Sequence, residues 1–313
     1  MKLLITGGAG FIGSHFTKLI VNQNEVPITE VIVLDSLTYA GNLANLESIK
    51  QKIEFIHGDI RDVNLVNKVT QRVDTIINFA AESHVDRSIK APHIFLDTNV
   101  LGLHNLLHFA RINSITNFLQ VSTDEVYGSI NEGKFTETDL LNPTSPYSAS
   151  KASGDLLALS FFKTYGLNIK ITRSSNNYGP NQFPEKIIPL FITNLMKNMK
   201  LPIYGDGTNI RDWIYVDDNC RGIFTVLNKG KSGSIYNIGG GYEITNLNLA
   251  LQILKEMGHS KNKIEFVTDR KAHDFRYSID CSKIENELGF RISKDFSEGL
   301  KETIQWYLNH AIL

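Results

Sequence analysis

The sequence has little of what marks a secreted, membrane-spanning or redox-active protein. Only two of its 313 residues are cysteine, Cys220 and Cys281, and they stand in no metal-binding or redox spacing. Such usage indicates thiols in a reducing compartment rather than a disulfide framework. Apolar runs fall short of the ~18 residues that a membrane span needs, and the short run after Lys2 ends too soon in glycines to be a signal peptide. We therefore expect a cytoplasmic protein.

The chain also lacks an excess of either charge. Its 32 basic and 33 acidic residues leave a formal net charge of −1, so no overall field attracts nucleic acid or an acidic membrane. Apolar residues make up 42% of the chain and charged residues 21%, which is typical of a globular protein with a large core. The length favours about two domains or one large α/β unit.

Short apolar runs alternate with helical segments through the first two-thirds of the chain. This alternation predicts a parallel, doubly wound α/β sheet with right-handed crossovers. The expected strands are residues 3–6, 31–34, 53–56, 75–79, 118–122 and 169–173, and the expected helices lie near 11–22, 62–71, 94–112 and 147–165. Beyond residue 175 the pattern is less regular, with helices expected near 186–199, 217–228, 246–257 and 297–309.

A glycine-rich segment follows the first expected strand and opens the first helix. Gly7, Gly10 and Gly13 form the pattern G-x-x-G-x-x-G, which permits a tight turn and lets the backbone approach a pyrophosphate. Asp35 ends the second strand, where a carboxylate can bind an adenine ribose and repel a 2′-phosphate. The segment therefore predicts NAD rather than NADP, in a dinucleotide-binding domain over residues 1–175.

Two further strand ends are weaker candidates for cofactor contacts. Asp59 and Ile60 follow the third strand, where an adenine could lie. Phe79, Ala80 and Ala81 follow the fourth strand, and the two alanines would let a cofactor lie close. An ordinary structural role at either strand end stays open.

A tyrosine, a lysine and two carboxylates are the catalytic candidates. Tyr147 and Lys151 are four residues apart on an expected helix, so they share one face. An ammonium and a cationic nicotinamide nearby both favour tyrosinate, which predicts a lowered pKa for Tyr147. Thr123 ends the fifth strand and can bond the same substrate hydroxyl. Asp124 and Glu125 follow it and could be the acid and base of an elimination, or simply a solvated pair in a loop.

Taken together, these motifs resemble the dTDP-glucose 4,6-dehydratases of the extended short-chain dehydrogenase/reductase superfamily, over essentially the whole chain. The matching segments are AAESHVDRS at 80–88, STDEVYG at 122–128, NNYGP at 176–180, FPEK at 183–186 and RDW at 211–213. The resemblance implies a Rossmann-type sheet with a smaller α/β lobe, mostly residues 176–313, that binds substrate, while some later segments return to the first domain. It also implies NAD, a nucleotide sugar (dTDP-glucose) as substrate, and no metal.

The resemblance further implies a role for each catalytic candidate. Tyr147 takes the proton of the sugar's 4-hydroxyl while hydride leaves carbon 4 for NAD. Glu125 then removes the proton on carbon 5, and protonated Asp124 gives its proton to the departing 6-hydroxyl. The two adjacent carboxyls must therefore hold different protonation states, which burial and like-charge repulsion can produce.

The family pattern places other residues around the two ligands. The cofactor neighbours that it implies are Phe11, Ile12, Ser36, Thr38, Ser83, Thr98 and Asn177, together with Tyr147 and Lys151. The substrate neighbours are Ser83, Thr123, Asn176, Lys186, Ile187, Pro202, Tyr204, Arg211, Asn246, Arg270 and His273, with Arg211 as a clamp on the diphosphate. The chain departs from the usual family residues at Lys271-Ala272, where Pro-Gly is common, and at Asn219, where His is common.

Superfamily members commonly form homodimers through a four-helix bundle, here implied for residues 94–112 and 147–165. The first of these helices is apolar on more than one side, whereas a helix that covers only its own sheet needs one stripe.

Three alternatives stay open at this stage. A 4,6-dehydratase of another sugar nucleotide would use the same residues. A sugar-nucleotide 4-epimerase would use Tyr147 and Lys151 but not Asp124 and Glu125. A silent NAD-binding sensor would typically lose the tyrosine or the lysine, and this chain keeps both.

Overall fold

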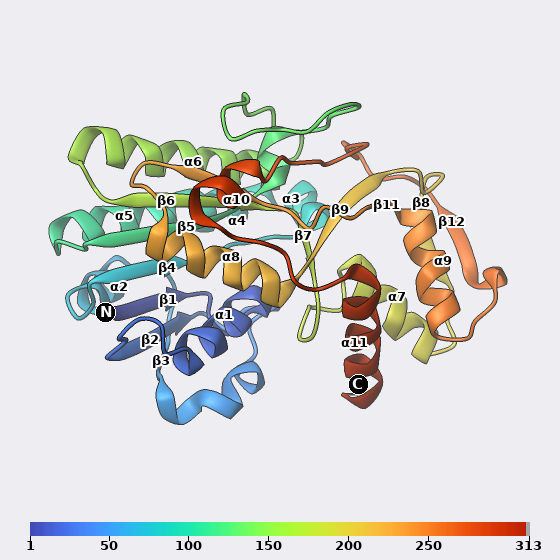
Figure 1. Cartoon of the computed structure of the whole chain (residues 1–313), viewed down its shortest axis with the longest axis horizontal. Coiled ribbons are helices and arrows are strands. Elements are labelled where there is room, and N and C mark those ends of the chain that lie inside the picture. Colours follow the sequence, from blue (N-terminus) through green and yellow to red (C-terminus); the bar gives the residue numbers. More distant parts are fainter. Residues whose placement is uncertain (311–313) are drawn as a thin grey trace.

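The computed structural model describes residues 1–310, and a parallel sheet forms its centre (Figure 1). In the described part of the chain this sheet has seven strands in the order β10-β6-β5-β4-β1-β2-β3, each paired in parallel with its neighbours. The strands are β1 (Lys2–Thr6), β2 (Glu30–Asp35), β3 (Glu54–His57), β4 (Thr75–Asn78), β5 (Asn117–Thr123), β6 (Ile169–Ser174) and β10 (Ile235–Ile238). The strand order reverses between β1 and β4, which opens a crevice beyond their carboxyl ends.

Helices cover both faces of the sheet, so the expected doubly wound fold is confirmed. The hydrophobic core on one face joins it to α1 (Phe11–Asn22), η1 (Leu43–Lys52), α8 (Val216–Lys229) and α10 (Ser282–Leu288). The core on the other face joins it to α2 (Val63–Thr70), α5 (Leu103–Ile112) and α6 (Pro146–Tyr165). Central strands that are buried on both faces read as continuous apolar runs, which is why the sequence revealed them.

Helix α6 has well-defined ends, and these fix where its catalytic candidates lie. Ser145 caps it in a reciprocal capping box with Ser148, and Pro146 occupies the first turn. Gly166 ends the helix in the left-handed conformation, with φ of 69°.

The prediction of a single helix over residues 94–112 is wrong. The chain instead forms α3 (Val85–Lys90), α4 (Pro92–Leu96), a π-helical turn η2 (Asp97–Gly102) and then α5. Within η2, the Asn99 side chain accepts a hydrogen bond from the Glu82 amide and donates to the Glu82 carbonyl and to Ser150 Oγ. These tertiary bonds accompany the wider turn, and periodicity alone cannot reveal them.

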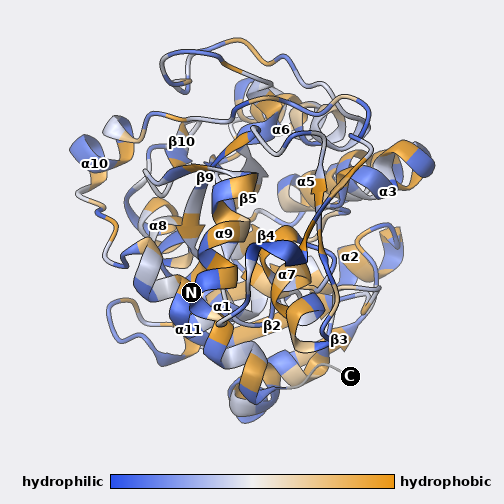
Figure 2. Cartoon of the chain, turned by 90° about the vertical axis from the view of Figure 1, so that its right-hand side faces the viewer, coloured by the Kyte–Doolittle hydropathy of each residue, from blue (hydrophilic) through white to orange (hydrophobic). Residues whose placement is uncertain are grey.

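A smaller lobe lies beyond the carboxyl edge of the sheet (Figure 1). Its strands are β7 (Asn176–Tyr178), β9 (Ile210–Tyr215) and β11 (Glu243–Thr245) in one sheet, with β8 (Leu201–Tyr204) and β12 (Ile264–Val267) in another. A third hydrophobic core joins them to α7 (Ile187–Met196), α9 (Asn246–Glu256) and α11 (Phe296–Asn309). Figure 2 looks onto this lobe and shows that α7 is mostly hydrophobic, whereas hydrophobic and hydrophilic residues alternate along α9. Within residues 1–310, no helix is both long and apolar enough to cross a membrane.

Candidate active site

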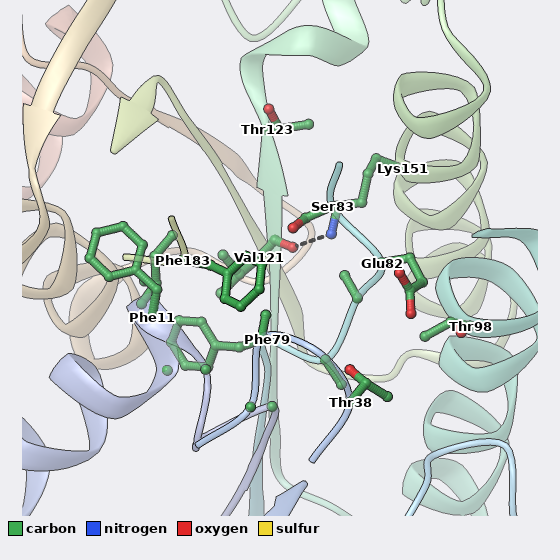
Figure 3. Close-up of a pocket in the computed structure, with 18 of the residues that line it drawn as sticks. Phe11, Thr38, Phe79, Glu82, Ser83, Thr98, Val121, Thr123, Lys151 and Phe183 are labelled. Carbon is green, nitrogen blue, oxygen red and sulfur yellow. Dashed lines mark hydrogen bonds between the residues drawn. The ribbon is translucent and has the colours of Figure 1, made fainter. Parts of the chain in front are cut away.

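A long cleft opens at the crevice between β1 and β4 and continues toward the smaller lobe. The empty space in and around it amounts to about 1610 Å³, which includes open solvent at its mouth. The loops that line it follow β1, β2, β3, β4, β5 and β6, and α6 adds Tyr147 and Lys151. Figure 3 labels some of these residues, among them Phe11, Thr123 and Lys151. The lining therefore extends from the glycine-rich loop to Asp124, Glu125 and Lys186.

Most residues singled out from the sequence line this cleft. They are Gly7, Gly10, Phe11, Ile12, Gly13, Asp35, Ser36, Thr38, Asp59, Ile60, Phe79, Ala80, Ala81, Ser83, Thr98, Thr123, Asp124, Glu125, Tyr147, Lys151, Asn176, Asn177 and Lys186. Of the others, Ile187 begins α7, Asn246 begins α9, Pro202 and Tyr204 lie on β8, Arg211 lies on β9, and Arg270 and His273 lie in the loop after β12. These seven come from the smaller lobe and, in the described structure, lie outside the cleft lining.

Sequence reasoning missed a further set of lining residues. They are Leu34, Ala40, Gly41, Gly58, Arg61, Glu82, Val121, Ser122, Ser174, Ser175, Gln182 and Phe183. Leu34, Val121 and Ser174 lie at the ends of strands whose neighbours were identified, so the strand ends themselves were a usable signal.

The glycine-rich loop forms a close-packed turn at the crevice. Gly7 has φ of +69°, and a Cβ there would lie 2.6 Å from the Ala80 backbone nitrogen. A Cβ on Gly13 would lie 2.2 Å from the Gly7 carbonyl oxygen. The loops after β1 and β4 thus touch, and their bare backbone faces the cleft beside the N-terminus of α1. Asp35 accepts hydrogen bonds from the amides of Ala9 (2.9 Å) and Leu37 (2.8 Å), which holds its carboxylate at the cleft wall.

Asp124 is a buried carboxyl whose surroundings favour its protonated form. Thr123 Oγ1 donates to Asp124 Oδ1 (3.2 Å) and accepts from the Glu125 amide (3.3 Å), which caps the short helix η3 (Asp124–Tyr127). The other oxygen, Oδ2, is buried and has no hydrogen-bond partner among residues 1–310. Burial raises the pKa of Asp124 well above its ordinary value, and the carboxylates of Glu125 and Asp212 raise it further.

Glu125 lies next to Asp124 in a different electrostatic environment. Burial raises its pKa too, but the positive charges of Arg270, Lys186 and Arg211 oppose that rise. The fold therefore places a carboxyl suited to donating a proton beside one suited to accepting a proton.

Tyr147 and Lys151 both face the cleft. The lowered pKa of Tyr147 was predicted with a nicotinamide beside it and stays a prediction, because in the protein without cofactor this pKa is raised. Burial and the Glu125 carboxylate raise the pKa of Tyr147 well above 10, and a hydrogen bond with Thr123 only partly opposes them. Lys151 Nζ donates to the Val121 carbonyl oxygen at 2.7 Å (Figure 3). Burial lowers the pKa of Lys151 to about 8, so the side chain stays mostly charged at pH 7 and titrates just above it.

A second group of cations lies on the side of the smaller lobe. The Arg211 guanidinium stacks 4.2 Å from the Tyr277 ring centroid and donates to main-chain carbonyls, including that of Asp274 at 2.9 Å. The Nε of Arg270 is buried and finds no partner in the described chain. His273 Nδ1 lies 2.6 Å from Asp269 Oδ1. Over residues 1–310, no group of three or more His, Cys, Asp or Glu side chains is arranged to hold a metal ion.

Comparison with known proteins gives matches over nearly the whole chain. The family model described as GDP-mannose 4,6 dehydratase matches residues 4–303. A dTDP-glucose 4,6-dehydratase from Actinoplanes sp. is 51% identical over 312 residues, which cover 98% of each chain. A dTDP-glucose 4,6-dehydratase from Streptomyces antibioticus is 49% identical, over 98% of this chain and 92% of the relative.

Solved structures show the same likeness. The crystal structure of DesIV, a dTDP-glucose 4,6-dehydratase from Streptomyces venezuelae with NAD and TYD bound, has a TM-score of 0.97 at 53% identity and covers 99% of this chain and 97% of its own. A UDP-glucose 4-epimerase from Thermotoga maritima has a TM-score of 0.92 at 29% identity, over 99% of this chain and 100% of its own. Because a dehydratase and an epimerase both superpose closely, the backbone does not distinguish the two chemistries.

Proposed function

Since the chain belongs to the GDP-mannose 4,6-dehydratase family of the extended short-chain dehydrogenase/reductase superfamily, we propose that it is a dTDP-glucose 4,6-dehydratase. The reaction converts dTDP-glucose to dTDP-4-keto-6-deoxyglucose and water. The observation that carries the proposal is the pair of adjacent carboxyls in the cleft lining, buried Asp124 and half-buried Glu125, which lie in different electrostatic environments. A 4-epimerase has no need of such an acid and base.

The cleft fits NAD, which this reaction uses. A Cβ on Gly7 or Gly13 would collide with backbone, so the turn that would hold a pyrophosphate is built without side chains. Asp35 would accept hydrogen bonds from the adenine ribose. When bound, NAD accepts the hydride of carbon 4, returns it to carbon 6 and adds positive charge beside Tyr147. Residues 1–175, with β10 and α8 packed onto their sheet, are the NAD-binding domain in this proposal.

The side chains of the cleft then move the protons. Tyr147, bonded to Thr123, takes the proton of the 4-hydroxyl once added positive charge lowers its pKa from the raised value of the protein alone. Glu125 removes the proton of carbon 5, which the 4-ketone acidifies, and a proton returns to carbon 5 when hydride reaches carbon 6. Asp124 keeps its proton at neutral pH and gives it to the departing 6-hydroxyl. Each acid or base contributes roughly 10²–10⁴-fold to the rate.

The smaller lobe supplies the cations that a nucleotide diphosphate requires. Lys186, Arg211 and Arg270 are near enough to Glu125 for each to lower its pKa, so their charges converge on the far end of the cleft. The unpartnered Arg270 Nε is a donor that a phosphate oxygen would satisfy. Asn176 Oδ1, buried without a partner in residues 1–310, is an acceptor in the cleft wall.

We infer further that the protein is a homodimer and that it works in the cytoplasm. Leu101 of η2 and Leu156 of α6 are each 59% exposed, on elements that contact one another. An exposed apolar face on a helix pair is suited to the same face of a second subunit, since such patches mark interfaces. Both Cys220 and Cys281 are free thiols, as a reducing compartment would keep them.

The test is mass spectrometry of dTDP-glucose incubated with the purified protein without added NAD. We expect loss of one water and no net accumulation of reduced cofactor. An unchanged mass with conversion to a 4-epimer would identify an epimerase instead. Loss of water from UDP- or GDP-sugars alone would reassign the nucleotide, and no turnover of any sugar nucleotide by NAD-loaded protein would indicate a silent NAD-binding protein.

A further inference from the structure

Three loops from distant parts of the chain meet between the cleft and solvent. The first follows β2 and carries Tyr39, flanked by the cleft-lining residues Thr38 and Ala40. The second follows β4, lines the cleft and leads into α3, which carries Arg87. The third precedes α7 and carries Glu185, between other residues that line the cleft. These loops therefore wall one cleft from separate positions along the chain.

Arg87 joins the first loop to the third. Its guanidinium carbon lies 3.7 Å from the centroid of the Tyr39 ring, within the range of a cation–π contact. Its Nε and Nη2 donate to Glu185 Oε2 at 3.1 Å and 3.0 Å. The Tyr39 ring also packs edge-on against Phe183, with centroids 5.5 Å apart. One side chain of α3 thus links two loops that would otherwise be free to separate.

The same residues connect this surface cluster to the cleft wall. Burial raises the pKa of Tyr39 to about 12, so the phenol stays neutral and can donate. Burial also raises the pKa of Glu82 in the cleft wall, and a hydrogen bond with Tyr39 opposes that rise. Next to Glu185, Lys186 Nζ donates to the Ser83 carbonyl oxygen at 2.8 Å. A movement of any of the three loops away from the cleft would break contacts to the other two.

We propose that Tyr39, Arg87 and Glu185 form a clasp that retains NAD in the cleft through each complete turnover. This inference rests on the proposed function, in which the hydride taken from carbon 4 must return to carbon 6 of the same sugar. Premature release of the cofactor would leave the protein unable to finish the reaction. Arg87 and Tyr39 are positioning residues here, because they act on the loops and not on the reacting atoms.

The test measures release of NAD from loaded protein after mixing with excess competing nucleotide. In Arg87→Ala and in Tyr39→Leu we expect the release rate to rise about ten-fold or more, equivalent to about 1.4 kcal/mol. During turnover of dTDP-glucose, the same variants should release reduced cofactor that an added NADH-consuming enzyme can trap. The matched control is Arg72→Ala, which removes another exposed arginine in ion pairs, with Glu54 and Glu30 on the outer strands. Its release rate should equal that of the wild type.

The outcomes separate this inference from the proposed function. Wild-type release rates in both variants, each folded by circular dichroism, would overturn the clasp, as would a wild type that fails to retain NAD. If Arg87→Ala does not fold, Tyr39→Leu and Glu185→Gln decide, because each breaks a different contact of the clasp. Faster release in the variants of a protein that dehydrates no sugar nucleotide would support the clasp while refuting the dehydratase.

Discussion

Asp124 and Glu125 are adjacent in sequence, yet the fold gives them different proton affinities. Burial raises the pKa of both, but the carboxylates of Glu125 and Asp212 add to the rise at Asp124, whereas Arg270, Lys186 and Arg211 oppose it at Glu125. Replacing Asp124 with asparagine removes the proposed acid but leaves Tyr147 and the cofactor site in place. We expect the initial oxidation to persist while elimination slows by about 10²–10⁴-fold. Single-turnover absorbance of reduced cofactor, followed by mass spectrometry of the sugar nucleotide, measures both steps.

The control for this variant is Asp139→Asn, which makes the same change at an exposed carboxylate in the loop after η3. Both steps should keep their wild-type rates in that protein. Dehydration at the wild-type rate in Asp124→Asn would remove Asp124 from the mechanism and leave Glu125 or a bound water as the proton source.

The burial of Asp124 should also be measurable as a stability cost that depends on pH. Its pKa is raised in the folded protein, so its contribution to stability is fully present below the unfolded pKa of about 3.9 and is lost as pH rises through the folded pKa. An asparagine at this position does not titrate. We therefore expect the unfolding free energy of Asp124→Asn to exceed that of wild type by a margin that grows from pH 4 to pH 8.

Chemical denaturation at a series of pH values measures this margin. Each unit of difference between the folded and unfolded pKa corresponds to about 1.4 kcal/mol. Asp139→Asn serves again as the control and should show no comparable trend. A margin that stays constant with pH would mean that Asp124 has an ordinary pKa in the folded protein, which would also weaken its role as the acid.

At the scale of helices and strands, the sequence was most informative where burial is complete. Residues Leu3 to Ile5 of β1 are fully buried, and the six expected strands agree with the observed ones to within one residue at each end. Strand β10 was missed because its four residues lie in the irregular part of the chain and join the sheet only through distant β6. The π-helical turn η2 was missed for a related reason, since the bonds of Asn99 that accompany it reach Glu82 and Ser150.

In the candidate site too, residues next to buried strands could be predicted, whereas properties that depend on distant contacts could not. Gly7, Asp35 and Thr123 lie directly after buried strands, so the strand pattern located them on the cleft wall. The burial of Tyr147 and its approach to Glu125, which both raise its pKa, could not be read from the sequence. The Lys151 ammonium instead bonds to the Val121 carbonyl, a contact that depends on how α6 packs on β5.

The junction between the glycine-rich turn and α1 predicts a contrast between two similar substitutions. A Cβ on Gly13 would lie 2.2 Å from the Gly7 carbonyl oxygen, whereas a Cβ on Gly10 would approach that atom only to 3.3 Å. Gly13→Ala must therefore displace backbone and should lower the unfolding free energy by about 1–3 kcal/mol. Gly10→Ala should lower the unfolding free energy much less. Denaturant unfolding of both variants, without nucleotide, tests this, and equal stabilities would show that the turn yields easily.

Across the whole molecule, the site depends on segments that lie far apart in the sequence. The carboxyl pair begins η3, directly after β5, while the cations that lower the pKa of Glu125 come from the loop before α7, from β9 and from the loop after β12. Family resemblance placed Arg211 and Arg270 near the substrate, but composition and periodicity could not, because the approach of the smaller lobe to the sheet is a tertiary property. The contact between the smaller lobe and the sheet therefore contributes to the difference in proton affinity between Asp124 and Glu125.

The proposed dimer gives the last prediction. Leu101 and Leu156, each 59% exposed, would be buried against the partner, where an unpaired ammonium is costly. We expect the double variant Leu101→Lys/Leu156→Lys to raise the dimer dissociation constant at least about 100-fold, or about 2.7 kcal/mol, as measured by analytical ultracentrifugation. Leu140→Lys is the matched control, because Leu140 is 88% exposed in the loop that precedes α6 and belongs to neither element. A double variant that remains dimeric while folded would place the interface on another surface.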